Sequence, residues 1–337
     1  MRLKKLKYNR KAKLGEEQLM KTALLQILSC PKCQGHLTCA PILQEAGEIK
    51  EGHLLCANHH DYEIKKFVPL FSPKENYVKA FEFMERHSIF NLPEKEGEKL
   101  SVKQMTEKEF QGQTDFSLDK LRGKRVLDAG CGGGRFISYL QKQGVEVIGI
   151  DMRPGLLYEY ASEFKDDSRF HLIQANLFEL PFQENSFDYI FSLGVLHHTP
   201  DPKKAFMGLV RYLKKGGKIA IWVYPRKPAT YISDALRPLT TRMPLSLLCA
   251  MGLIITTLYA PLLKIPRIGN LLRSILYRTR LPWHNQWNWR MHNFMDWYGP
   301  KYQFKFTNEE IQKWFREAGL TNIKLFAYKT SAQGTKI

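Results

Sequence analysis

One glycine-rich stretch, from Val126 to Arg135, limits what this chain can fold into more than any other feature. It reads VLDAGCGGGR, an apolar run ending in Asp128, then alternate glycines, then the start of a helical segment. We expect a buried strand, a tight turn and a helix N-terminus, because glycine tolerates positive φ and leaves the backbone open to a ligand. The free N–H groups of a helix N-terminus add partial positive charge. A second predicted strand, 145–150, ends at Asp151, where a carboxylate suits a ribose diol.

The spacing of the glycines separates two kinds of nucleotide cofactor. A dinucleotide fingerprint requires G-x-G-x-x-G, whereas this chain carries Gly130, Gly132 and Gly134 at alternate positions. The pattern D-x-G-x-G-x-G resembles motif I of the class I S-adenosylmethionine-dependent methyltransferases. The resemblance implies that Asp128 and the three glycines hold the methionine end of S-adenosylmethionine, and that Asp151 binds its ribose. An ordinary glycine-rich turn is the alternative.

Later segments extend the same resemblance over residues 120–224. The run LPFQENSFDYIFS, which begins at Leu180, is similar to the family's approach to its fourth strand, and a Lys-Gly-Gly turn leads into a fifth strand at 218–224. Apolar strands alternate with helical stretches, which predicts an α/β fold with a doubly wound parallel sheet. The final segment from Thr307 looks like the family's usual ending, with a capping box between Thr307 and Glu310. We therefore expect a seven-stranded, Rossmann-like methyltransferase domain.

The resemblance also assigns the adenine side of the cofactor site. The third predicted strand ends at Asn176, where the family usually has Asp for the adenine amino group, and an amide oxygen can accept the same hydrogen bond. Met152 and Leu177 would surround the adenine, and Leu193 would line the site at the end of the fourth strand.

Two adjacent histidines, His197 and His198, are the candidate catalytic residues. They follow the fourth strand at its carboxyl end, where ligands bind in open α/β sheets. A neutral imidazole could take the proton of an acceptor group near neutral pH. Methyl transfer is also an in-line displacement in which much of the rate can come from alignment alone, and the same pair is common in related enzymes of many substrates. A structural role for the pair therefore stays open.

A small metal-binding module is expected at residues 24–72. The candidate ligands are Cys30, Cys33, Cys56 and one of His59 and His60. Two thiolates on a tight turn, with a distant Cys and His, can complete a tetrahedral structural zinc site. The metal would supply folding energy to a segment that is too small to form its own core.

The module resembles the zinc ribbon of certain bacterial ribosomal-RNA guanine methyltransferases, and the related short domain that activates other methyltransferases. That resemblance implies His60 as the fourth ligand, although His59 is close enough to compete. Cys39 is then either a spare thiol or an alternative ligand. A reduced, metal-free pair or a redox pair is the alternative interpretation of Cys30 and Cys33.

Charge suggests the kind of partner. Lys and Arg number 51 against 33 Asp and Glu, a net charge of +18, which favours RNA or an anionic membrane face as a neighbour; an ordinary basic enzyme is the alternative. Residues 1–23 form a basic arm, and residues 73–119 a helical linker whose helix at 75–90 could cover the cofactor. With six Cys and no N-terminal apolar segment, we expect a cytoplasmic protein.

An insertion at 225–302 interrupts the predicted methyltransferase domain, 120–337. Its segment 245–263 has nineteen residues without a charge, long enough to span a bilayer. A single crossing would separate the last two strands from the sheet. We therefore expect no transmembrane span, but either a hydrophobic lid or a helical hairpin in peripheral contact with a membrane.

An aromatic segment, 283–302, follows within the insertion, with four Trp, two His and one Asp. Aromatic rings with convergent polar groups are typical of an active-site cap that excludes water, although an aromatic anchor onto the core is the alternative. The candidate substrate residues are Trp283, His284, His292, Asp296, Trp297, Tyr298 and Lys301.

These patterns predict a methyltransferase that uses S-adenosylmethionine and a structural Zn²⁺ and acts on a small-molecule, lipid-linked or glycan intermediate. The first alternative is a ribosomal- or transfer-RNA methyltransferase. Against it, no amide-proline motif for base amines follows the fourth strand, where Ser192-Leu-Gly-Val stands. The second alternative is a non-catalytic scaffold or partner-binding protein.

Overall fold

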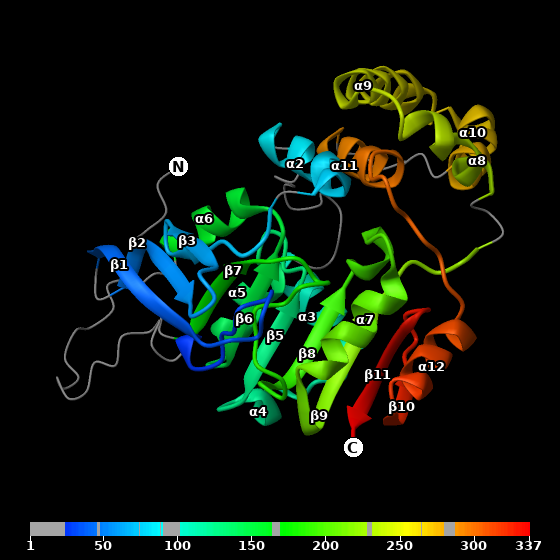
Figure 1. Ribbon diagram of the computed structural model, residues 1–337. Coiled ribbons are helices and arrows are strands. Elements are labelled where there is room, and N and C mark those ends of the chain that lie inside the picture. The colour runs from blue at the N-terminus through cyan, green and yellow to red at the C-terminus, as the bar shows by residue number, and fades with distance from the viewer. Residues whose placement is uncertain are drawn as a thin grey trace.

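The computed structural model describes residues 24–45, 48–73, 75–87, 89, 102–163, 169–227, 231–263, 265–279 and 287–337. These residues form two sheets and two groups of helices (Figure 1). The basic arm at 1–23, together with Trp283 and His284, lies outside the described residues.

The larger sheet has seven strands in the order β10-β11-β9-β8-β5-β6-β7. Its members are β5 (Arg125–Ala129), β6 (Glu146–Asp151), β7 (Phe170–Gln174), β8 (Phe187–Leu193), β9 (Leu213–Trp222), β10 (Leu320–Leu325) and β11 (Ser331–Lys336). Only β11 runs antiparallel to its neighbours. The predicted α/β sheet is confirmed as mostly parallel, and the strand order reverses between β5 and β8, the place where such sheets bind ligands.

Helices cover both faces of this sheet: α3 (Val102–Thr114), α4 (Leu118–Leu121), α5 (Arg135–Gln141), α6 (Pro154–Glu163), α7 (Pro202–Arg211) and α12 (Asn308–Glu317). Successive strand residues point to opposite faces. Val126 accordingly packs in one buried cluster with residues of α3 and α5, and Leu127 in another with residues of α7 and α12. Both faces of the central strands are buried, which explains their nearly continuous apolar sequences.

The smaller sheet contains β1 (Leu37–Glu45), β2 (Glu48–Cys56), β3 (Asp61–Lys65) and β4 (Val68–Pro69), all antiparallel. It adjoins the edge of the larger sheet at β7 (Figure 1). Leu28 pairs with Phe182, and Leu70 pairs with Gln174. Leu28 belongs to the same buried cluster as Leu127. The N-terminal module therefore shares its core with the main sheet.

The second group of helices lies beyond the carboxyl ends of the parallel strands: η1 (Asn76–Val78), α2 (Lys79–Arg86), α8 (Tyr231–Thr240), α9 (Leu245–Leu262), α10 (Pro266–Thr279) and α11 (Trp287–Tyr298). In Figure 1, α2 and α11 lie side by side above the sheet, and α9 lies beyond α11. A Cβ at Gly252 of α9 would be 2.4 Å from Phe294 of α11, so this glycine permits the close approach of the two helices. Among the described residues, no helix combines the length and apolar character that a membrane crossing requires.

Candidate functional site

The glycine loop between β5 and α5 is closed by hydrogen bonds to β6. The backbone N–H groups of Gly130 and Cys131 donate to Ile150 O at 2.8 and 2.9 Å. The φ of Gly130 is 90°, and a Cβ there would lie 2.4 Å from Val195. Gly132 N donates to Asp151 Oδ2 at 2.9 Å. A side chain at position 130 would therefore collide with Val195, so glycine is required where the loop leaves β5.

A cavity of about 330 Å³ lies against this loop, within the usual size of small-molecule sites. Six of the predicted cofactor residues line it: Gly130, Gly132, Asp151, Met152, Leu177 and Leu193. Three of the predicted catalytic or substrate residues line the same cavity, namely His198, His292 and Asp296. The structure thus brings two separately predicted groups of residues into one space.

Other lining residues were not identified from the sequence. Tyr77 and Phe81 belong to η1 and α2, and Tyr224 follows β9. A cover helix was predicted at 75–90, so its aromatic residues were the available signal for the first two. Tyr224 ends the predicted fifth strand, at the same sheet edge as the other strand-end residues.

Arg153 connects the cofactor loop to the cover helix, and sequence reasoning missed it as well. Asp151 Oδ1 accepts from the backbone N of Arg153 at 3.0 Å and from its Nε at 3.1 Å. A guanidinium nitrogen of Arg153 lies 3.8 Å from Glu85 of α2. Burial opposes the charge of Arg153, but Asp151 and Glu85 outweigh it and raise the arginine pKa. The predicted ribose-binding carboxylate is therefore held in position from two sides.

Three predicted cofactor residues do not line the cavity. Asp128 lies beneath the loop, 2% exposed, and burial, followed by the charge of Asp151, raises its pKa well above the usual range. Asn176 uses Oδ1 to accept from Phe178 N at 3.1 Å. Gly134, with φ 69°, lies against Tyr160. In this structure these residues shape the loop and the strand end and lie behind the cavity surface.

His198 has a defined tautomer. Its Nδ1 lies 2.9 Å from Tyr302 O, and because a carbonyl can only accept, Nδ1 carries the proton. Nε2 is then the basic nitrogen, 4.0 Å from Asp296 Oδ1. Burial lowers the pKa of His198, and Asp296 and the Tyr302 carbonyl oppose this only in part. His198 is therefore a neutral imidazole with a lone pair on the side of Asp296.

His197 is in a different environment from its neighbour. It is fully buried and does not line the cavity, and its ring stacks on Tyr224 at 3.8 Å. Burial, together with the nearby His198, lowers its pKa well below the usual value. Tyr224 OH in turn donates to Asp296 Oδ2 at 2.5 Å. His197 thus supports the residues of the cavity wall from behind.

The remaining predicted substrate residues face elsewhere. The Trp297 ring stacks on Tyr224 at 5.3 Å, and Tyr298 is 2% exposed inside the cluster formed by α2, α9 and α11. Lys301 is exposed, with its ammonium 5.2 Å from the Tyr302 ring. The aromatic segment therefore contributes His292 and Asp296 to the cavity lining, while Trp297 and Tyr298 pack α11 against its neighbours.

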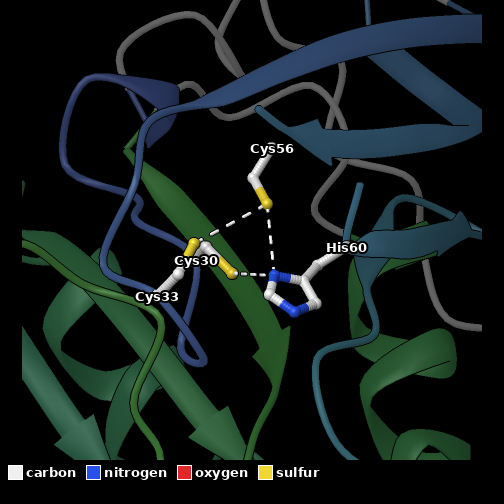
Figure 2. A group of neighbouring side chains, drawn as sticks. All are labelled: Cys30, Cys33, Cys56 and His60. Carbon is white, nitrogen blue, oxygen red and sulfur yellow. Dashed lines mark hydrogen bonds between the residues drawn. The ribbon is translucent and has the colours of Figure 1, made fainter. Parts of the chain in front are cut away.

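The N-terminal module brings together four side chains that could hold a metal ion, Cys30, Cys33, Cys56 and His60 (Figure 2). Their ligand atoms all lie within 4.8 Å of one another. The sulfurs of Cys33 and Cys56 are 3.7 Å apart, and a tetrahedral zinc with Zn–S bonds of about 2.3 Å separates two sulfurs by about 3.8 Å. The Nδ1 of His60 is 3.3 Å from Cys30 Sγ and from Cys56 Sγ. This donor set fits zinc in both type and spacing.

The surroundings of Cys30 favour its thiolate form, and neither His59 nor Cys39 belongs to the group of four. Burial opposes ionisation of Cys30, but the Tyr62 hydroxyl, whose oxygen lies 3.0 Å from the sulfur, and backbone N–H groups lower its pKa from 9.0 to about 6. His59 is exposed, with φ 60°. Cys39 lies on β1 outside the group of four.

Known proteins resemble the middle of the chain. A family model described as "Methyltransferase domain" matches residues 127–221. A ubiquinone biosynthesis O-methyltransferase from Alkalilimnicola ehrlichii is 34% identical over 119 residues, which are 34% of this chain and 47% of that protein. A tRNA U34 carboxymethyltransferase from Hydrogenovibrio crunogenus is 36% identical over 114 residues, 31% of this chain and 33% of that protein. The chain thus spans half or less of the length of these two relatives.

Solved structures also match over a larger part of the chain. The structure of a 1,6-didemethyltoxoflavin-N1-methyltransferase from Burkholderia thailandensis, with 1,6-didemethyltoxoflavin and S-adenosylhomocysteine bound, is 15% identical. The match covers 88% of this chain and 99% of that one, with a TM-score of 0.42.

The sheet, the glycine loop and the family match define a class I S-adenosylmethionine-dependent methyltransferase domain within this chain. The family match ends at residue 221. The N-terminal four-stranded module and the helices α8 to α11 therefore lie outside the matched residues.

Proposed function

We propose that this protein transfers the methyl group of S-adenosylmethionine to a small-molecule or lipid-linked acceptor held beneath α11. One observation carries the proposal. A single cavity is lined both by Gly130, Gly132 and Asp151, the residues expected to hold the cofactor, and by His198 and Asp296. A donor bound at the first three residues would therefore share this space with an acceptor near the other two.

The residues present fit this cofactor. The glycine loop offers bare backbone, Asp151 offers a carboxylate for the ribose hydroxyls, and Met152 and Leu177 offer apolar surface for the adenine. When bound, the cofactor supplies a methyl group on a positively charged sulfur. All remaining steps depend on this chain's own residues.

For a hydroxyl acceptor, His198 is the proposed base. As the O–CH₃ bond forms and the S–CH₃ bond breaks, the hydroxyl proton passes to Nε2 of His198. The Tyr302 carbonyl holds the opposite nitrogen in its protonated form, and Asp296 stabilises the imidazolium that results. The named O-methyltransferase relative supports an oxygen acceptor. The aromatic rings of Tyr77 and Phe81 exclude water from the same space.

The proposal is tested with methyl-labelled S-adenosylmethionine. We would incubate it with purified protein and cell extract, then separate RNA, lipid and small-molecule pools. We expect label in the lipid or small-molecule pool, and no label with an Asp151→Ala variant that has lost cofactor affinity. Label confined to RNA would overturn the proposed substrate class. Failure of the folded protein to bind the cofactor in a titration would favour the scaffold alternative.

RNA methylation is the second candidate. The net charge of +18 favours a polyanionic partner, and one relative is named as a tRNA-modifying enzyme. In the labelling experiment this candidate predicts label in RNA that high salt abolishes, because neutralised phosphates release counterions on binding.

We further propose that Cys30, Cys33, Cys56 and His60 bind one structural Zn²⁺. The spacing and softness of the four donors support this. Metal analysis should give about one zinc per chain, lost in Cys33→Ser and retained in Cys39→Ser. A folded, metal-free wild-type protein would reject it. We include a cytoplasmic location in the proposal, because the Cys30, Cys33 and Cys56 thiolates that would bind zinc persist in a reducing compartment.

A further inference from the structure

The cap helices expose a large apolar surface. Of the twenty exposed large hydrophobic side chains of the described residues, thirteen lie between residues 232 and 277, in or next to α8, α9 and α10. These helices lie at one end of the molecule, beyond α11 (Figure 1). Soluble monomers rarely expose contiguous apolar surface on this scale, and such surfaces mark sites of interaction.

Helix α9 shows two opposite apolar sides. One side, with Leu248 and Thr256, is buried against α11. The other side carries Leu247, Ile254 and Leu258, which are 50%, 58% and 66% exposed. No residue of α9 is charged. A helix that is apolar all round is normally covered on every side, and in the described structure only one side is covered.

Helix α10 continues the surface. Ile268, Leu271 and Ile275 recur at helical spacing, and they are 46%, 66% and 46% exposed. The buried Leu276 and Gly269 lie on its other side. The exposed stripe is thus a continuous apolar face of the helix and contains no acidic residue.

The charges around this surface are almost all positive. Residues 231–279 contain six Lys or Arg and one acidic residue, Asp234, which is already paired with Lys305. Arg242, Arg267 and Arg273 are exposed near the apolar residues. Arg237 is buried instead and donates to Trp297 O and Pro300 O at 2.6 Å, so it fastens α8 to the end of α11.

We propose that the exposed face of α8, α9 and α10, here called the cap face, docks this protein onto an anionic lipid bilayer without crossing it. Apolar side chains with a basic surround match the boundary between acyl chains and anionic headgroups. A second copy of the chain would instead bring the same positive residues together, in a protein of net charge +18. Charge complementarity therefore selects the lipid surface.

The cap face is coupled to the candidate active site through α11. The inner side of α9 packs on this helix, which carries His292 and Asp296 in the cavity wall. Docking would place the roof of the cavity next to the bilayer. Membrane docking deepens the proposed function, because it points to an acceptor embedded in the membrane. The docking itself does not depend on the proposed function; only the methylation of such an acceptor rests on it.

The test is co-flotation of the full-length protein with phosphatidylcholine vesicles, with and without phosphatidylglycerol. We expect binding that requires phosphatidylglycerol and weakens as salt is raised. The double variant Ile254→Glu/Leu258→Glu should lose at least about tenfold in vesicle affinity. Ile42→Glu, a matched change at a 71% exposed residue of β1, should bind vesicles as the wild type does.

Charge and fold are checked separately. Arg267→Glu/Arg273→Glu should weaken binding to anionic vesicles but not S-adenosylmethionine binding, which also shows that a variant is folded. A protein that binds the cofactor but no vesicle would overturn the inference while leaving the proposed function standing. A protein that binds vesicles but not the cofactor would overturn the proposed function and leave the docking inference standing. The inference would also be overturned if the wild-type protein bound no vesicles but formed concentration-dependent dimers that Ile254→Glu/Leu258→Glu abolished. The cap face would then be an interface with a second copy of the chain.

Discussion

At the scale of single residues, His198 is the group on which the proposed chemistry depends most. We expect His198→Gln to lower kcat by about 10²–10⁴-fold while changing the affinity for S-adenosylmethionine little, because its role begins with the acceptor. Rate measurements on the labelled acceptor and a cofactor titration check both. Equal loss of kcat and cofactor affinity would contradict a base role.

Asp296 should act through His198. Its carboxylate raises the histidine pKa against the effect of burial, so Asp296→Asn should lower that pKa further. The acidic limb of the rate–pH profile should then move to lower pH, since His198 must be neutral to accept a proton. If Asp296 had only a structural role, Asp296→Asn would reduce the rate but leave the acidic limb at the same pH. The rate–pH profile of the variant distinguishes the two roles.

His197 gives a prediction about stability. Its pKa is lowered in the folded protein by burial and by His198, so below about pH 6.5 the unfolded chain binds a proton that the folded chain does not. Folding stability should therefore fall as pH decreases, by up to about 1.4 kcal/mol per pH unit from this residue. Urea unfolding at several pH values gives the free energy of unfolding as a function of pH. We expect this free energy to depend less steeply on pH in His197→Phe than in the wild type. An equal dependence on pH would contradict the assignment.

The residues missed by sequence reasoning share a cause. Arg153 and Tyr224 lie in the site because strands distant in the chain end at the same sheet edge and because α2 folds back over it. Neither residue has a motif of its own. Asp128 was assigned to the cofactor through the family pattern, yet burial places it behind the loop. A local pattern predicts which loop forms the site but does not predict which side chains reach its surface.

At the scale of elements, α12 shows what local signals can predict. The Thr307 hydroxyl accepts from Glu310 N at 3.3 Å, and Glu310 Oε2 accepts from Thr307 N at 2.7 Å, so the predicted capping box is confirmed. Thr307→Ala should destabilise the protein by about 1 kcal/mol. Lys313→Ala on the exposed side of the same helix is the control, and denaturant unfolding should show a change within about 0.5 kcal/mol.

The packing of the cap helices shows what local sequence signals cannot predict. The apolar segment 245–263 predicted either a hydrophobic lid or a helical hairpin in the membrane interface, and its uniformly apolar composition gave no periodicity from which to choose an inner face. The structure selects that face through Gly252, whose missing side chain admits Phe294. The strands β5, β6 and β7, by contrast, were predicted from their apolar sequences, which reflect the burial of both of their faces.

At the scale of the whole molecule, the N-terminal module and the cofactor site are neighbours. Ser72 Oγ accepts from Asn176 N at 3.0 Å, and Phe71 N donates to Gln174 O at 2.9 Å. If zinc holds the module, Cys33→Ser should lower S-adenosylmethionine affinity several-fold as well as removing the metal. Cofactor titration of this variant beside Cys39→Ser measures the effect; full cofactor affinity without metal would show that the two sites are independent.

The hydrophobic core shared by the module and the main sheet limits how the chain can be divided into independent domains. Leu28, Phe71 and Phe182 belong to one buried cluster that also contains residues of β5 and β6. In the part of the chain that the structure describes, the module and the main sheet meet through buried apolar side chains, so separating them would expose hydrophobic surface on both. A chain trimmed to the family-like segment would expose the β7 edge to water and to other chains. Transferring the N-terminal module to a different protein would therefore require transferring β7 as well.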